Sequence, residues 1–152
     1  MPFDSLSQKL FLHLWKTYDI LRDIENTCLI DFGLSPQQFN VLRILKANHP
    51  GTVPTMELSR QMITKAPDIT RMLDRLEVRK LVERFRHLDN RRVVEVSITT
   101  QGLSLLKEMQ EVIVQMHERQ VGHLKKREKE QLIELLRAAR HPHQTVAEGW
   151  LS

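Results

Sequence analysis

Apolar side chains recur along most of the chain at the three- or four-residue spacing of an amphipathic helix. This pattern predicts a long first helix, a second helix that begins after Ser35, a short helix after Thr55 and a fourth helix that begins near Ile69. Two longer helices follow toward the C-terminus. Where the pattern defines both ends, the expected helical ranges are about 4–30, 36–48, 100–121 and 126–140.

Each predicted helix has an apolar side that should face a core. The 36–48 helix presents inward Phe39, Leu42 and Leu45. The 100–121 helix has an apolar seam of Leu103, Leu106, Met109, Ile113 and Met116. The 126–140 helix is expected to bury Leu132, Leu135, Leu136 and Ala139. The outer helices carry more apolar surface than one small domain needs, so we expect them to form a dimer interface.

The period of the pattern changes to two near the middle of the chain. Val94, Val96 and Ile98 alternate with polar residues, and the segment 82–88 runs back against them across a turn at 89–91. This predicts a two-stranded β-hairpin, the wing. The expected fold class is therefore mainly α with a small β wing. A winged helix-turn-helix lobe is expected over 35–101, of the kind that binds DNA, with dimerisation helices expected over 1–34 and 102–152, within a single 152-residue domain.

Charge is unevenly distributed along the chain. Residues 53–101 contain 10 Lys or Arg and 7 Asp or Glu, so they hold most of the formal net charge of +4. In the same segment a helix of a size to fill the DNA major groove precedes a hairpin slim enough for the adjacent minor groove. The pattern predicts a protein that binds double-stranded DNA.

The sequence offers little support for an enzyme or a metal protein. It contains no nucleophile elbow, P-loop, dinucleotide-binding glycine run or HExxH pattern, so we expect no catalytic residue and no cofactor. His117 and His123 are six residues apart and do not share a helix face, so no metal site is expected. No apolar run approaches the length of a membrane span, and Cys28 is the only cysteine. A cytoplasmic protein with no membrane partner is expected.

The fourth helix carries its charged residues opposite its apolar side. Arg71 and Arg75 are four residues apart and share a helix face, where a guanidinium can bind guanine or a phosphate. The alternative is ion pairing on a solvated helix with Asp68, Asp74 or Glu77. Further candidate contacts form or precede the first helical turn: Lys65, Ala66, Pro67, Asp68 and Thr70. Asp68 can cap this turn or accept from cytosine, and capping is the expected role.

The turn of the wing contains two adjacent arginines. A narrow, A·T-rich minor groove has an enhanced negative potential, so we expect Arg91 at the tip to enter it. Arg92 and Arg86 are expected to contact phosphates, and Asp89 is expected to hold the turn through its own side chain. The alternative is a charged hairpin that only contacts solvent.

Four segments occur in the order and spacing of one known family. They are ITRMLDRLE at 69–77, LVER at 81–84, the Asp-x-Arg-Arg turn at 89–92 and Ile-Thr-x-x-Gly at 98–102. In these segments the chain resembles the multiple-antibiotic-resistance regulator (MarR) family of bacterial transcription factors, and the likeness covers nearly the whole chain. The resemblance implies a homodimer of triangular outline whose terminal helices intertwine. Each recognition helix would lie in a major groove, and each wing in a minor groove, of a pseudo-palindromic operator.

The resemblance also implies that a small ligand, or cysteine oxidation in some members, releases the DNA. We therefore expect a repressor that occludes a promoter site. Two positions depart from common family patterns, since Ile63 stands in a tight turn and Lys80 at a helix end where many members have glycine. A left-handed backbone at Lys80 would cost about 1 kcal/mol.

The expected effector pocket lies between the DNA-binding lobe and the dimer helices. Trp15, Tyr18 and Phe39 would supply apolar walls, and Arg22 or Arg43 would bind an anionic group. The alternative is that these aromatic side chains belong to the core.

Three other functions stay open. A protein-interaction module could use the same winged-helix scaffold, a carrier would bind a small molecule without affecting DNA, and a redox-sensing regulator would act through Cys28. A sensor needs a stabilised thiolate, and the neighbouring Glu25 and Asp31 would oppose its charge. An inert thiol is therefore expected.

Overall fold

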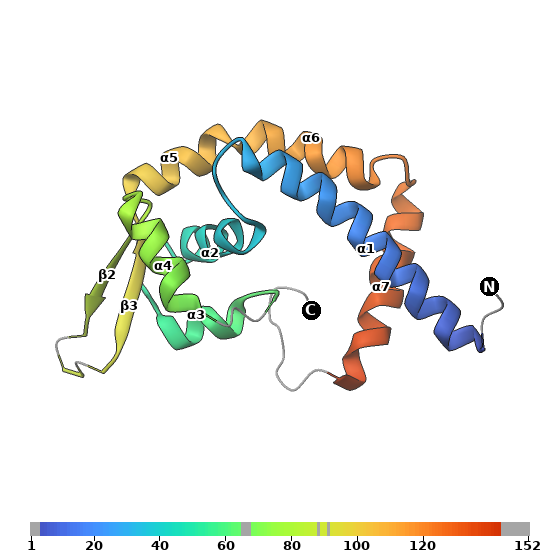
Figure 1. Cartoon of the computed structure of the whole chain (residues 1–152), viewed down its shortest axis with the longest axis horizontal. Helices are drawn as coiled ribbons and strands as arrows, with labels where there is room; N and C mark the ends of the chain where they lie inside the picture. The colour runs from blue at the N-terminus through green and yellow to red at the C-terminus, as the bar shows by residue number, and fades with distance from the viewer. Residues whose placement is uncertain (1–3, 65–67, 88, 91, 144–152) are drawn as a thin grey trace. The chain divides into compact units, whose positions relative to one another are not determined.

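The computed structural model describes residues 4–64, 68–87, 89, 90 and 92–143. It divides into two compact units, Met1–Met116 and His117–Ser152. The elements are α1 (Leu6–Ile30), α2 (Pro36–Ala47), β1 (Val53–Pro54), α3 (Thr55–Gln61), α4 (Ile69–Val78), β2 (Val82–Arg86), β3 (Val94–Ile98), α5 (Thr100–Glu108), α6 (Gln110–Val121), α7 (Lys126–Arg140) and a 3₁₀ turn, His141–His143 (Figure 1). The predicted fold class, mainly helical with a small β wing, is confirmed.

The second helix begins as its sequence predicts. Ser35 is the N-cap of α2, and its Oγ accepts from the backbone N–H of Gln38 at 3.2 Å. The side-chain oxygen of Gln38 accepts in return from the backbone N–H of Ser35 at 2.9 Å. Two otherwise unpaired N–H groups are thus satisfied within four residues, which is why this helix start is readable from sequence.

The core of the first unit surrounds α2. The predicted inward residues of α2, Phe39, Leu42 and Leu45, are all buried. They pack with buried side chains from the other elements of the lobe, which include Leu58, Leu73, Leu76, Val82, Val96 and Met109. Each fully buried leucine contributes about 1.5–3 kcal/mol relative to an exposed one. This core fixes the inner side of α4 and the base of the wing.

The sheet has three strands in the order β1-β3-β2, one more than predicted. β2 pairs antiparallel with β3 from Val82 opposite Ile98 to Arg86 opposite Val94. β1 is a two-residue strand on the other edge of β3, and it contains Pro54. Proline is tolerated at a sheet edge, but so short a segment has no period to recognise in the sequence. The β2–β3 hairpin projects from the helical lobe (Figure 1).

The helix predicted over 100–121 is interrupted at one residue. Met109 lies between α5 and α6, with φ −72° and ψ −15°. Its N–H donates to the carbonyl of Leu105 at 3.0 Å, and its carbonyl accepts from the N–H of Ile113 at 2.9 Å. The predicted seam is confirmed, because Leu106, Met109 and Met116 are buried and Leu103 and Ile113 are half-buried.

The second unit contains α7, and its apolar residues are not buried within the chain. The exposed fractions of Leu132, Leu135 and Leu136 are 41%, 69% and 37%, and Ala139 is exposed as well. The prediction that these four side chains are buried is therefore wrong for a single chain. Helical spacing identifies an apolar side but does not say which surface covers it.

None of the described helices combines the length and the apolar character that crossing a membrane requires. Among the residues in the described ranges, no three His, Cys, Asp or Glu side chains gather as a metal site.

Candidate nucleic-acid interface

Helix α4, the expected recognition helix, displays a polar side and buries the opposite one. Leu73 and Leu76 are fully buried. The predicted outward residues, Thr70, Arg71, Asp74 and Arg75, are all exposed. Because the buried leucines anchor the helix to the lobe, the polar side is held in a fixed direction.

Asp68 caps this helix. Its Oδ1 accepts from the backbone N–H of Arg71 at 2.9 Å, so capping, the expected role, is confirmed. The predicted contacts Lys65, Ala66 and Pro67 lie outside the described residues. In the turn before them, the N–H of Ile63 donates to Oδ1 of Asn40 at 3.1 Å. Ile63 thus occupies the turn without a left-handed backbone, which the described non-glycine residues show only at Lys80, with φ 57°.

Arg84 of β2 binds both carboxylates of α4. Its Nη2 lies 2.5 Å from Oδ1 of Asp74 and 2.6 Å from Oε2 of Glu77, and its backbone N–H donates to Oε1 of Glu77 at 3.2 Å. The hydrogen bond from the Arg84 side chain lowers the pKa of Glu77 below its ordinary value of 4.5, and partial desolvation opposes this shift. The same bond raises the pKa of Arg84. The contact ties the wing to the recognition helix.

The carboxylates on and beside α4 have partners other than the side chains of Arg71 and Arg75. Asp68 is a cap, and Asp74 and Glu77 are bound by Arg84. Within the described part of the chain, the side chains of Arg71 and Arg75 form no ion pair, so the predicted alternative of pairing on the helix is not observed. Two guanidinium groups therefore face solvent beside two carboxylates that share the Arg84 guanidinium.

The wing carries more cations toward its turn. Arg86, the last residue of β2, and Arg92, which precedes β3, are both exposed. The described side-chain bond of this turn comes from Asn90, whose Oδ1 accepts from the N–H of Arg92 at 3.2 Å. Asp89, expected to hold the turn through its side chain, donates its backbone N–H to Nδ1 of His87 at 3.3 Å. Arg91 lies outside the described residues.

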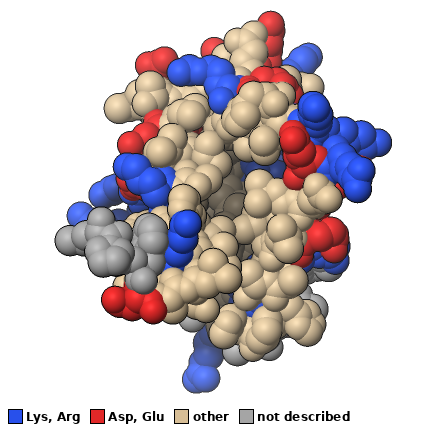
Figure 2. Space-filling model, turned by 90° about the vertical axis from the view of Figure 1, so that its right-hand side faces the viewer, with Lys and Arg blue, Asp and Glu red and all other residues tan. Residues whose placement is uncertain are grey.

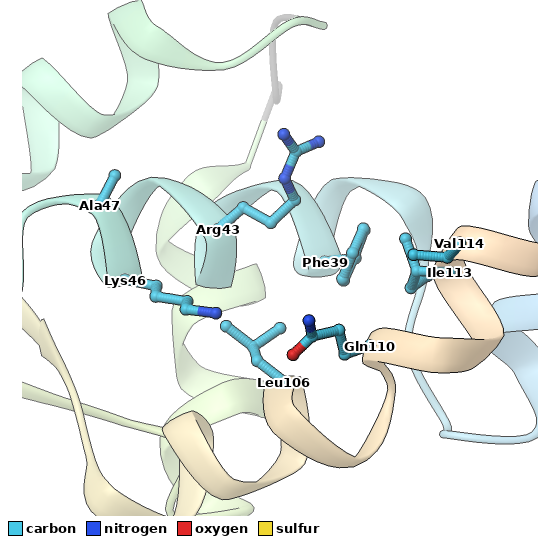
Figure 3. A pocket seen from close by; sticks show the side chains of 8 residues that line it. All are labelled: Phe39, Arg43, Lys46, Ala47, Leu106, Gln110, Ile113 and Val114. Carbon is cyan, nitrogen blue, oxygen red and sulfur yellow. The ribbon is translucent and has the colours of Figure 1, made fainter. Parts of the chain in front are cut away.

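A groove of about 410 Å³ lies between α2 and the α5–α6 helices (Figure 3). Its walls are formed by Phe39, Arg43, Lys46, Ala47, Leu106, Gln110, Ile113 and Val114. The lining contains two cations and no carboxylate. Figure 3 shows the Lys46 side chain extending toward Leu106 and Gln110, whereas Arg43 points away from them. An amphipathic anion is the small molecule that such walls suit best.

Only two of the five predicted pocket residues, Phe39 and Arg43, line this groove. Trp15 and Tyr18 lie on α1 with exposed fractions of 61% and 57%, so they belong neither to this groove nor to the core of the described chain. Arg22, expected to bind an anion, pairs with Asp19 at 3.2 Å and lies 5.6 Å from the centroid of the Tyr18 ring. The helical spacing of Trp15, Tyr18 and Arg22 predicts that they lie on one helix, but it does not predict which helix packs beside them.

Cys28 is half-buried, and its thiol donates to the carbonyl of Val112 with an Sγ–O distance of 3.9 Å. Partial burial reduces the access to oxidants that a redox-sensing thiol needs. The geometry favours the inert interpretation, and a redox role stays an alternative.

The sequence pattern did not predict the roles of two residues at these sites, Arg84 and Lys46. The family motif at 81–84 predicts no partner for Arg84, although Asp74 and Glu77, three residues apart on one helix face, indicate a site for a cation. Lys46 was overlooked beside Arg43. Phe39, Arg43 and Lys46 follow one another at spacings of four and three, which places all three side chains on one face of α2.

Comparison with known proteins gives a consistent result. The sequence profile of the MarR family matches residues 34–94. The HTH-type transcriptional regulator MhqR of Bacillus subtilis is 32% identical over 103 residues, which are 68% of this chain and 70% of that protein. A MarR transcription factor from Planctomyces limnophilus is 47% identical, with a TM-score of 0.72 over 90% of this chain and 99% of that one.

The fold is also that of Sco3205, a MarR family regulator from Streptomyces coelicolor solved in complex with DNA. It is 19% identical, with a TM-score of 0.81 over 95% of this chain and 96% of that one. The polar side of α4 and the wing that Arg84 ties to it are consistent with these similarities. The chain belongs to the MarR family, whose members are transcriptional regulators and not enzymes.

Proposed function

We propose that this regulator acts as a homodimer that binds a pseudo-palindromic DNA site and represses by occluding a promoter. The observation that carries the proposal is the charge pattern of α4. Arg84 binds both Asp74 and Glu77, while Arg71 and Arg75 remain exposed on the side of the helix that faces away from the core. A helix that presents unpaired guanidinium groups in this way suits a major groove.

In this proposal phosphates supply most of the affinity and the recognition helix supplies sequence choice. Arg86 and Arg92 would contact the DNA backbone, and Arg91 would enter the minor groove. Thr70 and the residues Lys65, Ala66 and Pro67 would lie closest to the bases. Such a protein acts where the chromosome lies, which in a bacterium is the cytoplasm.

The dimer is supported by apolar residues that the chain leaves exposed. On α1 the exposed fractions are 83% for Leu6, 57% for Leu10, 61% for Phe11 and 61% for Trp15. Figure 2 shows one face of the molecule, much of which is formed by residues other than Lys, Arg, Asp and Glu. Because burial of each large apolar side chain contributes about 1.5–3 kcal/mol, a second copy that covers α1 and α7 would be strongly favoured. The ranges 1–34 and 102–152 are proposed as dimerisation segments.

We assign the groove between α2 and the α5–α6 helices to an effector with an apolar ring and an anionic group. Phe39, Leu106 and Ile113 would contact the ring, and Lys46 or Arg43 would bind the anion. By thermodynamic linkage, such an effector must change DNA affinity by the factor by which DNA changes effector affinity.

The proposal is tested by selecting duplexes from a random pool with the full-length protein and measuring their affinity by fluorescence anisotropy at matched salt. Arg71→Ala, Arg75→Ala and Arg91→Ala should each weaken binding by about 1–3 kcal/mol without unfolding the protein. Arg60→Ala, which removes an exposed arginine of α3 outside the proposed DNA contacts, the groove and the dimerisation segments, is the matched control and should bind as the wild type does.

Two results would contradict the proposal. If the wild type selects no sequence and binds all duplexes weakly with a steep salt dependence, a protein-interaction module on this scaffold is the better interpretation. If light scattering finds a monomer at the concentrations used for binding, the two-site geometry fails. A carrier of small molecules would bind its ligand without any reciprocal effect on DNA.

A further inference from the structure

Arg79, the C-cap residue of the recognition helix α4, reaches the end of α1. Its Nη1 donates to the carbonyl of Gly33 at 2.6 Å, and its Nη2 donates to the carbonyl of Phe32 at 2.9 Å. These carbonyls are 46 and 47 residues away in the sequence. One half-buried side chain therefore links the two helices end to end.

The end of α1 is built to present these carbonyls. The N–H of Leu34 donates to the carbonyl of Leu29 at 3.2 Å, and the N–H of Gly33 donates to that of Ile30 at 2.9 Å, which is a Schellman motif. Gly33 has φ 63°, a conformation that glycine adopts readily. The motif leaves the carbonyls of Phe32 and Gly33 without partners in α1, and the negative end of the helix dipole lies beside them. The Arg79 guanidinium donates to both carbonyls, and its positive charge interacts favourably with the dipole.

The end of α4 is held from a second direction as well. Lys80 and Leu81 complete a Schellman motif on α4, with bonds to the carbonyls of Glu77 and Leu76 at 2.8 and 3.0 Å. The side chain of Thr99, the N-cap of α5, donates to the carbonyl of Lys80 at 2.6 Å. The side chain of Gln101 donates to the carbonyl of Arg79 at 3.3 Å. The C-terminal end of the recognition helix is thus bonded to both flanking helices.

We propose that Arg79 is a positioning residue that sets the direction of the recognition helix relative to α1, and so the separation of the two recognition helices in the dimer. This inference rests on the proposed function, in which α1 belongs to the dimer interface and α4 reads DNA. Leu29 of α1 and Leu73 and Leu76 of α4 belong to the same apolar core, but apolar burial is non-directional. A planar fork that donates to two carbonyls fixes an angle.

The test measures a property that a merely structural residue would not change. A duplex with two inverted half-sites, selected by the wild type from a random pool, is remade with the half-site spacing lengthened or shortened by one base pair. Affinities are measured for wild type, Arg79→Met and Arg79→Lys, with Arg60→Met, at an exposed arginine of α3, as a charge-matched control. We expect the wild type to lose more than about tenfold in affinity on a spacing change.

Arg79→Met should bind the original duplex about 5- to 20-fold more weakly and lose most of the preference for spacing, while its affinity for random duplexes changes less than about twofold. Arg79→Lys should behave like Arg79→Met, because one ammonium cannot span both carbonyls in their plane. If the Arg79→Lys variant kept the wild-type preference, charge alone would suffice and the fork would be excluded; this outcome overturns the proposal.

Gly33→Ala keeps every donor of Arg79 but strains the partner loop, since its Cβ would lie 3.4 Å from Nη1 at a φ of 63°. It should broaden the spacing preference in the same way, and it decides the question if Arg79→Met does not fold. A folded Arg79→Met protein with the wild-type preference overturns the inference alone. A wild type with no preference for any duplex overturns the proposed function first.

Discussion

Replacing Arg84 with methionine removes the contact between the wing and the recognition helix and leaves the apolar part of the side chain in place. Arg84 is the most buried of the three partners, with a side-chain exposed fraction of 21% against 54% for Asp74 and 39% for Glu77. Both carboxylates can therefore regain water when the guanidinium is removed. This limits the loss to about 1–2 kcal/mol of unfolding free energy, below that of a fully buried pair.

The same change alters the charge that faces DNA. Two carboxylates lose their partner on the helix that carries Arg71 and Arg75. Each carboxylate at roughly 10 Å from a phosphate adds about 0.4 kcal/mol of repulsion in water. Because removing the one guanidinium lowers the net charge by one unit, the loss is about 0.4 kcal/mol for each phosphate at this distance, or roughly 1 kcal/mol over two or three phosphates at low salt. It should shrink at physiological ionic strength, where the Debye length is about 8 Å.

The assay combines urea unfolding, followed by circular dichroism, with anisotropy titration of a selected duplex at low and moderate salt. The triple variant Arg84→Met, Asp74→Asn, Glu77→Gln is the matched control, because it removes the contact without releasing charge. It should recover most of the DNA affinity. If Arg84→Met unfolds at the wild-type urea concentration, or if the single and triple variants bind DNA equally weakly, the reasoning is refuted.

Three further predictions concern stability. The Arg84 hydrogen bond lowers the pKa of Glu77 below 4.5, so the stabilisation from this bond is present above that pH and is lost as the pH falls through the lowered value. The difference in unfolding free energy between wild type and Glu77→Gln should therefore be constant near neutrality and shrink below about pH 4.5. A difference that does not depend on pH would contradict this. Gly102→Ala places a Cβ against the carbonyl oxygen of Leu81, well inside van der Waals contact, so thermal unfolding should show a loss of about 3 kcal/mol or more, whereas Ser104→Ala on the same helix should be nearly neutral. Lys80→Gly relieves a left-handed backbone with φ 57° and should stabilise the protein by about 0.5–1 kcal/mol in urea unfolding; a loss of stability would show that the Lys80 side chain contributes more than its backbone strain.

Features that depend on neighbours within four residues were predictable from the sequence. The start of α2 at Ser35, the inward side of that helix and the cap at Asp68 all follow from contacts between residues close in the chain. The family resemblance marked Lys80 as a helix end where glycine is frequent, and the backbone there is left-handed, with φ 57°. The exposed arginines of α4 belong to the same class, since helical spacing alone separates them from the buried leucines.

Features that join distant segments needed the tertiary structure. The strand β1, at Val53–Pro54, exists only because β3 lies beside it, and two residues are too few to show the alternating pattern of a strand. The grouping of Trp15, Tyr18 and Arg22 with Phe39 was inferred without knowing which face of α1 meets α2, and the groove instead uses α5 and α6.

By itself, the amino-acid sequence determined the order of the helices, the wing and the cationic side of the recognition helix. Only the folded chain decided that Arg84 compensates the carboxylates of that helix and that Arg79 joins it to α1. The physical reason is the separation in sequence of the interacting residues. Periodicity and capping arise from bonds within a turn or two of the chain, whereas a guanidinium pairs with whatever acceptor the packed core brings within about 3 Å.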